Sequence, residues 1–286
     1  MQPGMRNFAE GLGRAEGLDR IGNPVADAIK KVLKPGPVKD LLSGTWLGHP
    51  LHPVLTDVPL GAWVSSLFLD LFGGKRARGA SDALLRVAGV TAIPTAVAGV
   101  SDWVDTVEEE RRVGVVHAAG NTLALGFLVG SLRARRKGRR ARGVLLSMLG
   151  QGVATVSAYL GGHLSFGKGV GVDQTAFEQG PKEWVAVMEA GALSDEKPAV
   201  ASLDGGIDVL LYRTNGRIYA ISNRCNHRAC PLSDGDVEEL NVICPCHGST
   251  FRLTDGGVVQ GPATGPQPAY DAREHDGRIE VKLREG

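Results

Sequence analysis

The chain has 286 residues, a formal net charge of +1 and 43% hydrophobic residues, with a mean hydropathy of −0.04. These values exclude a strongly acidic or strongly basic protein, but they identify no class of function because they average two unlike halves. Long apolar stretches occupy the first half, and the 4 cysteines all lie in one short window of the second half.

An amphipathic helix is predicted near the N-terminus, over residues 24–34. Apolar side chains recur there at helical spacing with charged side chains opposite them, and Pro35-Gly36-Pro37 ends the pattern. Such a helix suits the surface of a membrane, and packing against the soluble domain is the alternative. The apolar positions are Val25, Ala28, Ile29, Val32 and Leu33.

Four stretches of about twenty mostly apolar or small residues follow, which is the length that crosses the hydrocarbon core of a bilayer. Their glycine, alanine, serine and threonine residues allow close packing of membrane helices. A soluble four-helix bundle is the alternative, because Asp57, Asp70 and Arg86 lie near the ends of the stretches. The predicted spans are residues 54–72, 84–103, 113–132 and 143–163.

The charges of the connecting loops predict an orientation in a bacterial cell membrane. Loops 73–82 and 133–142 are rich in lysine and arginine, whereas the loop between them contains Glu108–Glu110. By the positive-inside rule the two basic loops are cytoplasmic, so the N-terminus and the C-terminal half lie outside. We interpret the arginines of loop 133–142 as an orientation signal and expect no nucleic-acid partner.

Beyond the last span, residues 164–182 contain several glycines and predict a flexible tether with a span of roughly 20 to 25 Å. Short β-type runs separated by turn signals then continue almost to the end of the chain, as in an all-β sandwich or partly open barrel. The predicted strands are residues 184–189, 207–213, 217–222, 237–243, 258–260 and 278–283.

Two short motifs combine cysteine with histidine: Cys225-Asn226-His227 and Cys244-Pro245-Cys246-His247. Two thiolates and two imidazoles form the ligand set of a [2Fe–2S] cluster in which two Cys hold one iron and two His hold the other. A tetrahedral zinc site is the alternative. It would leave the second pair of cysteines unexplained.

The stretch resembles the Rieske iron–sulfur domains, and more narrowly the branch in which a disulfide ties the two cluster loops together. Pro262, in Gly261-Pro262-Ala263, stands where these domains carry a proline loop that shields the cluster. The resemblance implies that Cys225 and Cys244 hold one iron, that His227 and His247 hold the other, and that Cys230 pairs with Cys246.

The same resemblance predicts roles for three residues close to the ligands in the sequence. Ser249 stands where domains of high potential direct a serine hydroxyl at a bridging sulfide, and Phe251 stands where they direct a tyrosine hydroxyl at a ligand sulfur. Because Phe251 has no hydroxyl, we expect a potential below the top of the Rieske range of about −150 to +300 mV; a core aromatic is the alternative role. Arg228 replaces the leucine of quinol-oxidising complexes and suits an acidic redox partner, or is a solvated surface arginine.

Four histidines of the first half map to one end of the predicted bundle: His49, His52, His117 and His163. Imidazoles on facing helices can hold haem b or another metal. The alternative is that they cap helices or lie at the level of the lipid headgroups. The segment Gly48-His49-Pro50-Leu51-His52-Pro53 resembles the opening of an uncharacterised bacterial four-helix membrane family, which implies an architecture but no activity.

These patterns predict a multidomain chain in which an all-α four-helix transmembrane bundle is followed by an all-β Rieske domain. The expected domains are an N-terminal segment, the membrane domain, the flexible linker and the Rieske domain, over residues 1–48, 49–163, 164–182 and 183–286.

The predicted function is one-electron transfer by a membrane-anchored [2Fe–2S] carrier that works with a redox protein or a quinone. A subunit of a quinol-oxidising respiratory complex and a redox sensor without turnover are the alternatives. An oxygenase would need a further iron, held by two His and one carboxylate, in a domain after the cluster domain. We expect no such domain, because the chain continues for only about 40 residues after His247.

Overall fold

The computed structural model describes residues 4–284, whose contacts divide into two compact units. The first unit contains residues 4–33 and 51–170, and the second contains residues 34–50 and 171–284. Segment 34–50, here called the strap, thus belongs to the unit that carries the cysteines, although the strap precedes the membrane-length helices in the chain.

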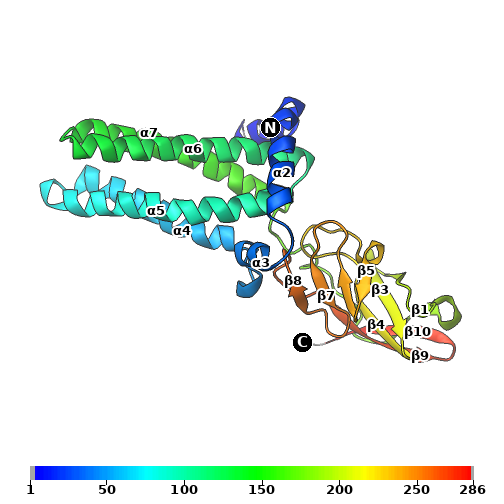
Figure 1. Cartoon of the computed structure of the whole chain (residues 1–286). Coiled ribbons are helices and arrows are strands. Elements are labelled where there is room, and N and C mark those ends of the chain that lie inside the picture. The colour runs from blue at the N-terminus through cyan, green and yellow to red at the C-terminus, as the bar shows by residue number, and fades with distance from the viewer. Residues whose placement is uncertain (1–3, 285–286) are drawn as a thin grey trace. The chain divides into compact units, whose positions relative to one another are not determined.

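Four long helices make up most of the first unit, and each is long and apolar enough to cross a membrane. Small and apolar side chains pack around Trp63, Leu85 and Leu128 in the interior, whereas Phe68 and Val90 are apolar and exposed on the outside. Helices that are apolar on all sides are typical of membrane spans, and the expectation of four such helices is confirmed. Figure 1 shows them side by side: α4 (Leu51–Phe72), α5 (Arg78–Trp103), α6 (Glu108–Arg136) and α7 (Arg140–Gly162).

A proline inside α4 is compensated by the neighbouring helix. Pro59 has no N–H group, so the carbonyl of Leu55, one turn earlier, loses its partner within the helix. The hydroxyl of Thr95 in α5 donates a hydrogen bond to this carbonyl at 3.1 Å. Because hydrocarbon offers no water to replace a lost partner, this contact both satisfies α4 and ties it to α5.

The helices before the bundle pack against α6. The helix expected over residues 24–34 begins earlier, at Asp19, and ends at Val32. Its Gly22 lies against the side chains of Val115 and Arg111, while its Val32 remains 88% exposed. One face of this helix therefore packs on α6, and apolar side chains at its edge remain exposed. These elements are α1 (Gly4–Gly13), η1 (Glu16–Leu18) and α2 (Asp19–Val32), and the bundle also contains the short turns η3 (Lys75–Ala77) and η4 (His163–Gly167).

The second unit is built on two antiparallel sheets, so the expected all-β class is confirmed. Six strands pair in the order β1-β10-β9-β4-β3-β2, and four pair in the order β5-β6-β7-β8. The edge strands β1 and β2 approach each other, which makes the larger sheet nearly closed. The strands are β1 (Val185–Glu189), β2 (Ala199–Leu203), β3 (Ile207–Thr214), β4 (Arg217–Ser222), β5 (Asp236–Glu238), β6 (Asn241–Ile243), β7 (Thr250–Arg252), β8 (Val258–Gln260), β9 (Ala269–His275) and β10 (Arg278–Leu283).

One predicted strand is wrong. Residues 237–243 form two short strands, β5 and β6, rather than a single one. The chain reverses at Glu239 and Leu240, whose φ angles are +47° and +64°. Neither residue favours the left-handed region, so the sequence contains no turn signal at this point.

Short helices complete the second unit. The strap contains α3 (Pro37–Ser43), which begins with proline in its first turn and ends at Gly44, where φ is +85°. The single turn η2 (Thr45–Leu47) follows directly. Proline at a helix start and glycine after its end are the expected boundary residues. Two further turns lie between strands, η5 (Ala190–Ala192) and η6 (Leu232–Asp234).

The stretch expected as a flexible tether, residues 164–182, is shared between the two units. Within the first unit, the N–H of Val170 donates to the carbonyl of Leu164 at 2.9 Å. Within the second, the N–H of Gln174 donates to the carbonyl of Asn226 at 2.9 Å, and Ser222 Oγ donates to Glu178 at 2.7 Å. Specific contacts therefore hold parts of this stretch at both of its ends.

Candidate metal centre

Two loops with the same backbone pattern carry the cysteine and histidine motifs. In the first loop the N–H of Cys225 donates to the carbonyl of Cys230 at 2.9 Å, and the N–H of Ala229 donates back to Cys225 at 2.7 Å. In the second loop, Cys244, Ser249 and Gly248 repeat these two bonds at 2.8 and 3.0 Å. Each loop is thus a closed turn that holds one cysteine at its start.

The two loops bring two thiols and two imidazoles together. Cys225 and Cys244 are each 1% exposed, and their side chains are joined by a hydrogen bond. The rings of His227 and His247 meet edge to face with centroids 5.1 Å apart, and the Nδ1 atoms of both are shielded from solvent. Two sulfur and two inward nitrogen donors fit the ligand set of a Rieske-type [2Fe–2S] cluster.

Backbone amides surround both thiols and favour their ionised form. The N–H groups of His227 and Arg228 point at the sulfur of Cys225, and those of Cys246 and His247 point at the sulfur of Cys244. The hydrogen bond from Cys225 lowers the pKa of Cys244 to about 7, whereas the pKa of Cys225 is raised by the same bond and by burial. Cys244 is therefore the first thiol to ionise, and thiolate is the form that binds iron.

Burial lowers the pKa of His227 well below its usual range, and the electrostatic effects of His247, Lys39 and Arg228 act in the same direction. The imidazole is thus held neutral, which is the state a metal ligand needs.

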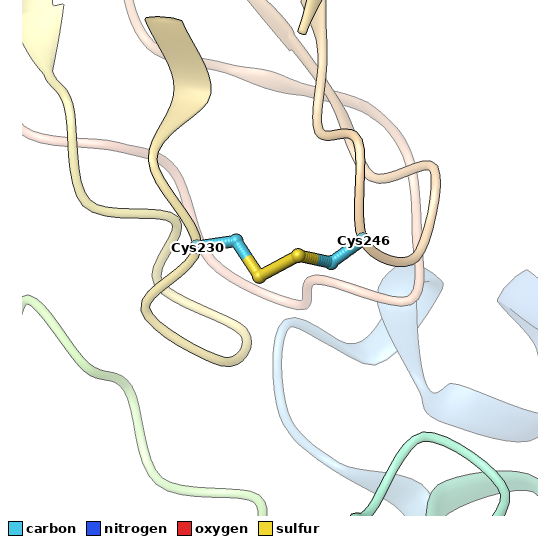
Figure 2. The surroundings of a disulfide bond; sticks show 2 residues. All are labelled: Cys230 and Cys246. Carbon is cyan, nitrogen blue, oxygen red and sulfur yellow. A yellow bond between two sulfur atoms is a disulfide. The ribbon is translucent and has the colours of Figure 1, made fainter. Parts of the chain in front are cut away.

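A disulfide joins the two loops and leaves two cysteines for the metal. Cys230 and Cys246 are bonded to each other (Figure 2), and Cys225 and Cys244 are the free thiols. Among the described residues, one group of three possible metal donors lies within 4.8 Å, and it consists of Cys244 and the two disulfide sulfurs. Because bonded sulfurs are not thiolate ligands, this group is not a separate metal site.

The four neighbours named from the sequence lie around these loops in different ways. Ser249 is fully buried, and its hydroxyl oxygen accepts a hydrogen bond from the N–H of Ala263 at 3.0 Å. Phe251 is fully buried in the core beneath the loops. Pro262 lies in the loop that reaches Ser249 through Ala263, and Arg228 is half-buried beside His227.

The strap contacts the same loops, which the sequence did not predict. The N–H of Gly261 donates to Asp40 Oδ1 at 2.9 Å, and Thr45 Oγ1 donates to the carbonyl of Ala263 at 3.1 Å. Pro35 lies against Gly248, where an added Cβ would be only 2.8 Å from the proline ring. Burial raises the pKa of Asp40, and the Gly261 N–H opposes this shift. No spacing or motif connects residues more than two hundred positions apart, so pattern analysis had no signal for this contact.

The histidines named for the first half contact different groups. His52 Nδ1 lies 2.9 Å from the carbonyl of Thr95, and His117 Nδ1 lies 2.7 Å from the carbonyl of Ser157. His163 Nε2 lies 3.7 Å from Glu10. His49 is exposed and belongs to the second unit with the strap.

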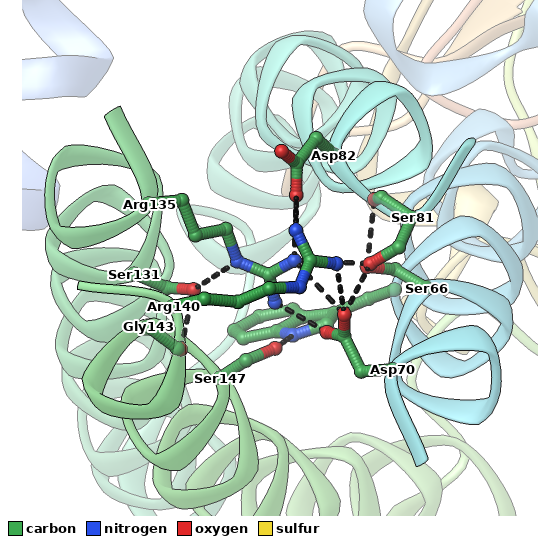
Figure 3. Close-up of polar contacts among 10 residues, drawn as sticks. Ser66, Asp70, Ser81, Asp82, Ser131, Arg135, Arg140, Gly143 and Ser147 are labelled. Atoms are coloured by element: carbon green, nitrogen blue, oxygen red, sulfur yellow. Dashed lines mark hydrogen bonds and ion pairs between the residues drawn. The ribbon is translucent and has the colours of Figure 1, made fainter. Parts of the chain in front are cut away.

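A buried ionic network occupies one end of the bundle (Figure 3), and the sequence had suggested only that Asp70 lies near a helix end. The carboxylate of Asp70 is fully buried between Arg135 and Arg140. Asp82 Oδ1 lies 2.8 Å from Nη1 of Arg135 and 3.1 Å from Nη1 of Arg140. Ser81 Oγ donates a hydrogen bond to Asp70 at 2.7 Å. All four long helices contribute to the network, through the last turns of α4 and α6 and the first turns of α5 and α7.

Comparison with known proteins agrees with this arrangement. Residues 183–271 match the family described as "Rieske [2Fe-2S] domain", and residues 48–174 match "Predicted membrane protein (DUF2231)". The chain is 31% identical over 108 residues to sulredoxin of Sulfurisphaera tokodaii, which covers 35% of this chain and 98% of that protein.

Ferredoxins of oxygenase systems are also similar. The naphthalene 1,2-dioxygenase system ferredoxin component of Pseudomonas putida is 32% identical over 98 residues, which cover 34% of this chain and 94% of the ferredoxin. Among solved structures, the ferredoxin of carbazole 1,9a-dioxygenase from Nocardioides aromaticivorans is 29% identical with a TM-score of 0.34, over 35% of this chain and 98% of that one.

Proposed function

Because the chain belongs to the Rieske [2Fe-2S] family and also carries a DUF2231 membrane domain, we propose that it is a membrane-anchored one-electron carrier. The observation that carries this proposal is the convergence of two free, buried thiols and two inward imidazole nitrogens in one unit of a chain that also contains four apolar helices of membrane length. When bound there, the [2Fe–2S] cluster takes up and releases one electron at a time.

The residues of the site divide into ligands and supports. Cys225 and Cys244 would hold one iron, and His227 and His247 would hold the other through their buried Nδ1 atoms. The backbone amides aimed at the two sulfurs stabilise their negative charge. Because Nδ1 faces inward, the opposite edge of each imidazole is the route for electron exchange. The Cys230–Cys246 disulfide fixes the distance between the loops.

A redox protein is the partner we propose. Two of the similar proteins are named as ferredoxin components of dioxygenase systems, so each belongs to a system with other protein components. Arg228 adds a positive charge beside His227, which suits an acidic docking surface. A quinone is the second candidate, and it would make the chain part of a quinol-oxidising complex; a redox sensor is the third.

Electron paramagnetic resonance during a redox titration of the purified full chain tests the proposal. We expect one signal of a Rieske cluster, two irons per chain, and a potential independent of pH near neutrality. A potential that shifts with pH in that range would favour quinol chemistry. Zinc in place of iron, or no resonance after reduction, would overturn the proposal.

We place the cluster domain on the extracytoplasmic side of the membrane. The basic loop 133–142 supports this orientation, as does the Cys230–Cys246 disulfide, because disulfides are rare in the cytosol. Single cysteines introduced into loop 133–142 should react with an impermeant reagent only after the cells are opened. Labelling of intact cells would reverse the orientation.

A haem b or another metal in the membrane domain is a separate proposal, for His49, His52, His117 and His163. A carbonyl can only accept a hydrogen bond, so Nδ1 of His52 and of His117 carries the proton and Nε2 has the lone pair. Metal-binding histidines share this protonation state. At His117 the lone pair accepts a hydrogen bond from Asn121 Nδ2 at 3.1 Å, which a metal would have to displace. A purified protein without a Soret band, and with iron as the only metal at two per chain, would remove this proposal.

A further inference from the structure

The strap is anchored on the loop that covers the metal centre. Asp40 accepts from the N–H of Gly261, and Thr45 donates to the carbonyl of Ala263. Gly261 has no room for a side chain, since an added Cβ would be 2.2 Å from Thr45 Oγ1. The strap and the proline loop therefore fit closely at the two anchors.

Between Pro35 and the anchors, the strap carries a buried lysine. Lys39 is only 3% exposed, which is rare for a lysine. It stands between Pro35, which lies against Gly248, and Asp40, which accepts from the N–H of Gly261. The strap thus places an ammonium group, largely out of contact with water, beside the second cysteine loop and the proline loop.

We propose that Lys39 tunes the metal centre: its charge stabilises the reduced, more negative cluster and raises the reduction potential, and the Asp40 and Thr45 anchors hold it in position. This inference rests on the proposed function. A charge inside a protein acts through a lower effective dielectric constant than one in water, and salt screens it much less than a surface charge. Lys39 therefore affects the reduction potential through its charge and is not a ligand of the cluster.

The test is a redox titration of the full chain, followed by electron paramagnetic resonance, in wild type, Lys39→Met, Lys39→Arg and Lys34→Met. Lys34 lies on the same strap but is exposed, which makes it the matched control. We expect Lys39→Met to lower the reduction equilibrium constant about tenfold, which is about 59 mV for one electron. Lys39→Arg should largely preserve the potential, and Lys34→Met should leave it unchanged.

Variants of the two anchors, Asp40 and Thr45, provide a second, independent test. Asp40→Asn with Thr45→Val should lower the potential toward that of Lys39→Met, and adding Lys39→Met to this background should then change it little. The difference between wild type and Lys39→Met should also persist at high ionic strength. If the loss of both anchors leaves the potential unchanged, the positioning role of the strap is wrong.

The outcomes separate this inference from the proposed function. A normal cluster signal with an unaltered potential in Lys39→Met would overturn the role of Lys39 and leave the electron carrier in place. Equal shifts in Lys39→Met and Lys34→Met would also overturn it, because a general surface effect would explain both. Absence of the cluster from wild type would overturn the proposed function itself.

Discussion

Arg140 Nη2 lies 2.6 Å from Asp70 Oδ1, which joins the start of α7 to the end of α4 inside the helical bundle. Arg135 pairs with the same carboxylate from α6. Asp70 is thus the centre of the ionic network, and its side chain is completely buried while that of Asp82 is 25% exposed. This difference in burial predicts a difference in the effect of mutation.

Asp70→Asn should destabilise the bundle strongly. The substitution removes one charge and leaves the Arg135 guanidinium, which is 3% exposed, with Asp82 as its remaining anionic partner among residues 4–284. Breaking one side of a buried ion pair costs about 3–5 kcal/mol. Thermal unfolding of the purified protein, followed by tryptophan fluorescence, should show a large fall in the midpoint. Asp82→Asn is the control and should cause a clearly smaller fall; equal falls would contradict the central role of Asp70.

Loss of the Cys230–Cys246 disulfide should weaken the second unit. The bond spans 16 residues, and closing a loop of that size contributes about 3 kcal/mol. The variant to make is Cys230→Ser with Cys246→Ser, because a single substitution would leave a reactive thiol within 4.8 Å of Cys244. Denaturant unfolding followed by the visible circular dichroism of the cluster should detect this loss. Unchanged stability would show that the loops are held by their backbone hydrogen bonds alone.

The ligand loops were predictable because their chemistry restricts both residue type and spacing. A cluster of this kind requires two cysteines and two histidines. In the structure the thiols of Cys225 and Cys244 are in contact, and so are the rings of His227 and His247. The apolar spans were predictable for a similar reason, since the thickness of a bilayer fixes the length of a helix that crosses it. In both cases a requirement from outside the chain, the ligand set of a cluster or the thickness of a bilayer, restricts the residues of one short stretch of sequence.

Features that depend on distant contacts were not predictable. Lys39 and Asp40 read as ordinary polar residues of a short linker, and only the fold places them beside His227 and Gly261. Strand β9 escaped prediction because charged residues interrupt its apolar pattern. Its place in the sheet comes from backbone pairing with β10 and β4, and such pairing leaves little trace in a single sequence.

Ser249 and Phe251 are the two buried residues that we expect to affect the reduction potential, and substitutions of them should shift it in opposite directions. Ser249→Ala removes a hydroxyl, and we expect it to remove with it a hydrogen bond to the cluster that favours the reduced state. A bond worth about 1 kcal/mol more in the reduced state corresponds to about 40 mV, so the potential should fall by about that amount. Phe251→Tyr should raise it if the new hydroxyl reaches a ligand sulfur.

Redox titration of both variants measures these shifts, and Phe251→Leu provides a control for repacking of the core. Because Phe251 is fully buried, the tyrosine variant needs a check of stability beside the titration. A rise in potential in both Phe251 variants would attribute the effect to packing rather than to the hydroxyl.

Tyr270 predicts a loss of stability at alkaline pH. Burial, with a smaller effect of the nearby Glu178, raises its pKa to about 12. The unfolded chain, with an ordinary value near 10, loses this proton first as pH rises. Ionisation of Tyr270 therefore leaves stability unaffected below about pH 10 and lowers it progressively between about pH 10 and pH 12, by up to about 2.7 kcal/mol.

Tyr270→Phe should remove this dependence. The Tyr270 hydroxyl is buried and has no hydrogen-bond partner within residues 4–284, so its loss should be neutral or stabilising near pH 9. Denaturant unfolding of both proteins at about pH 9 and about pH 11 should show a decline of about 1.4 kcal/mol in wild type that the variant lacks. Parallel declines in the two proteins would assign the alkaline sensitivity to other groups, because phenylalanine cannot ionise.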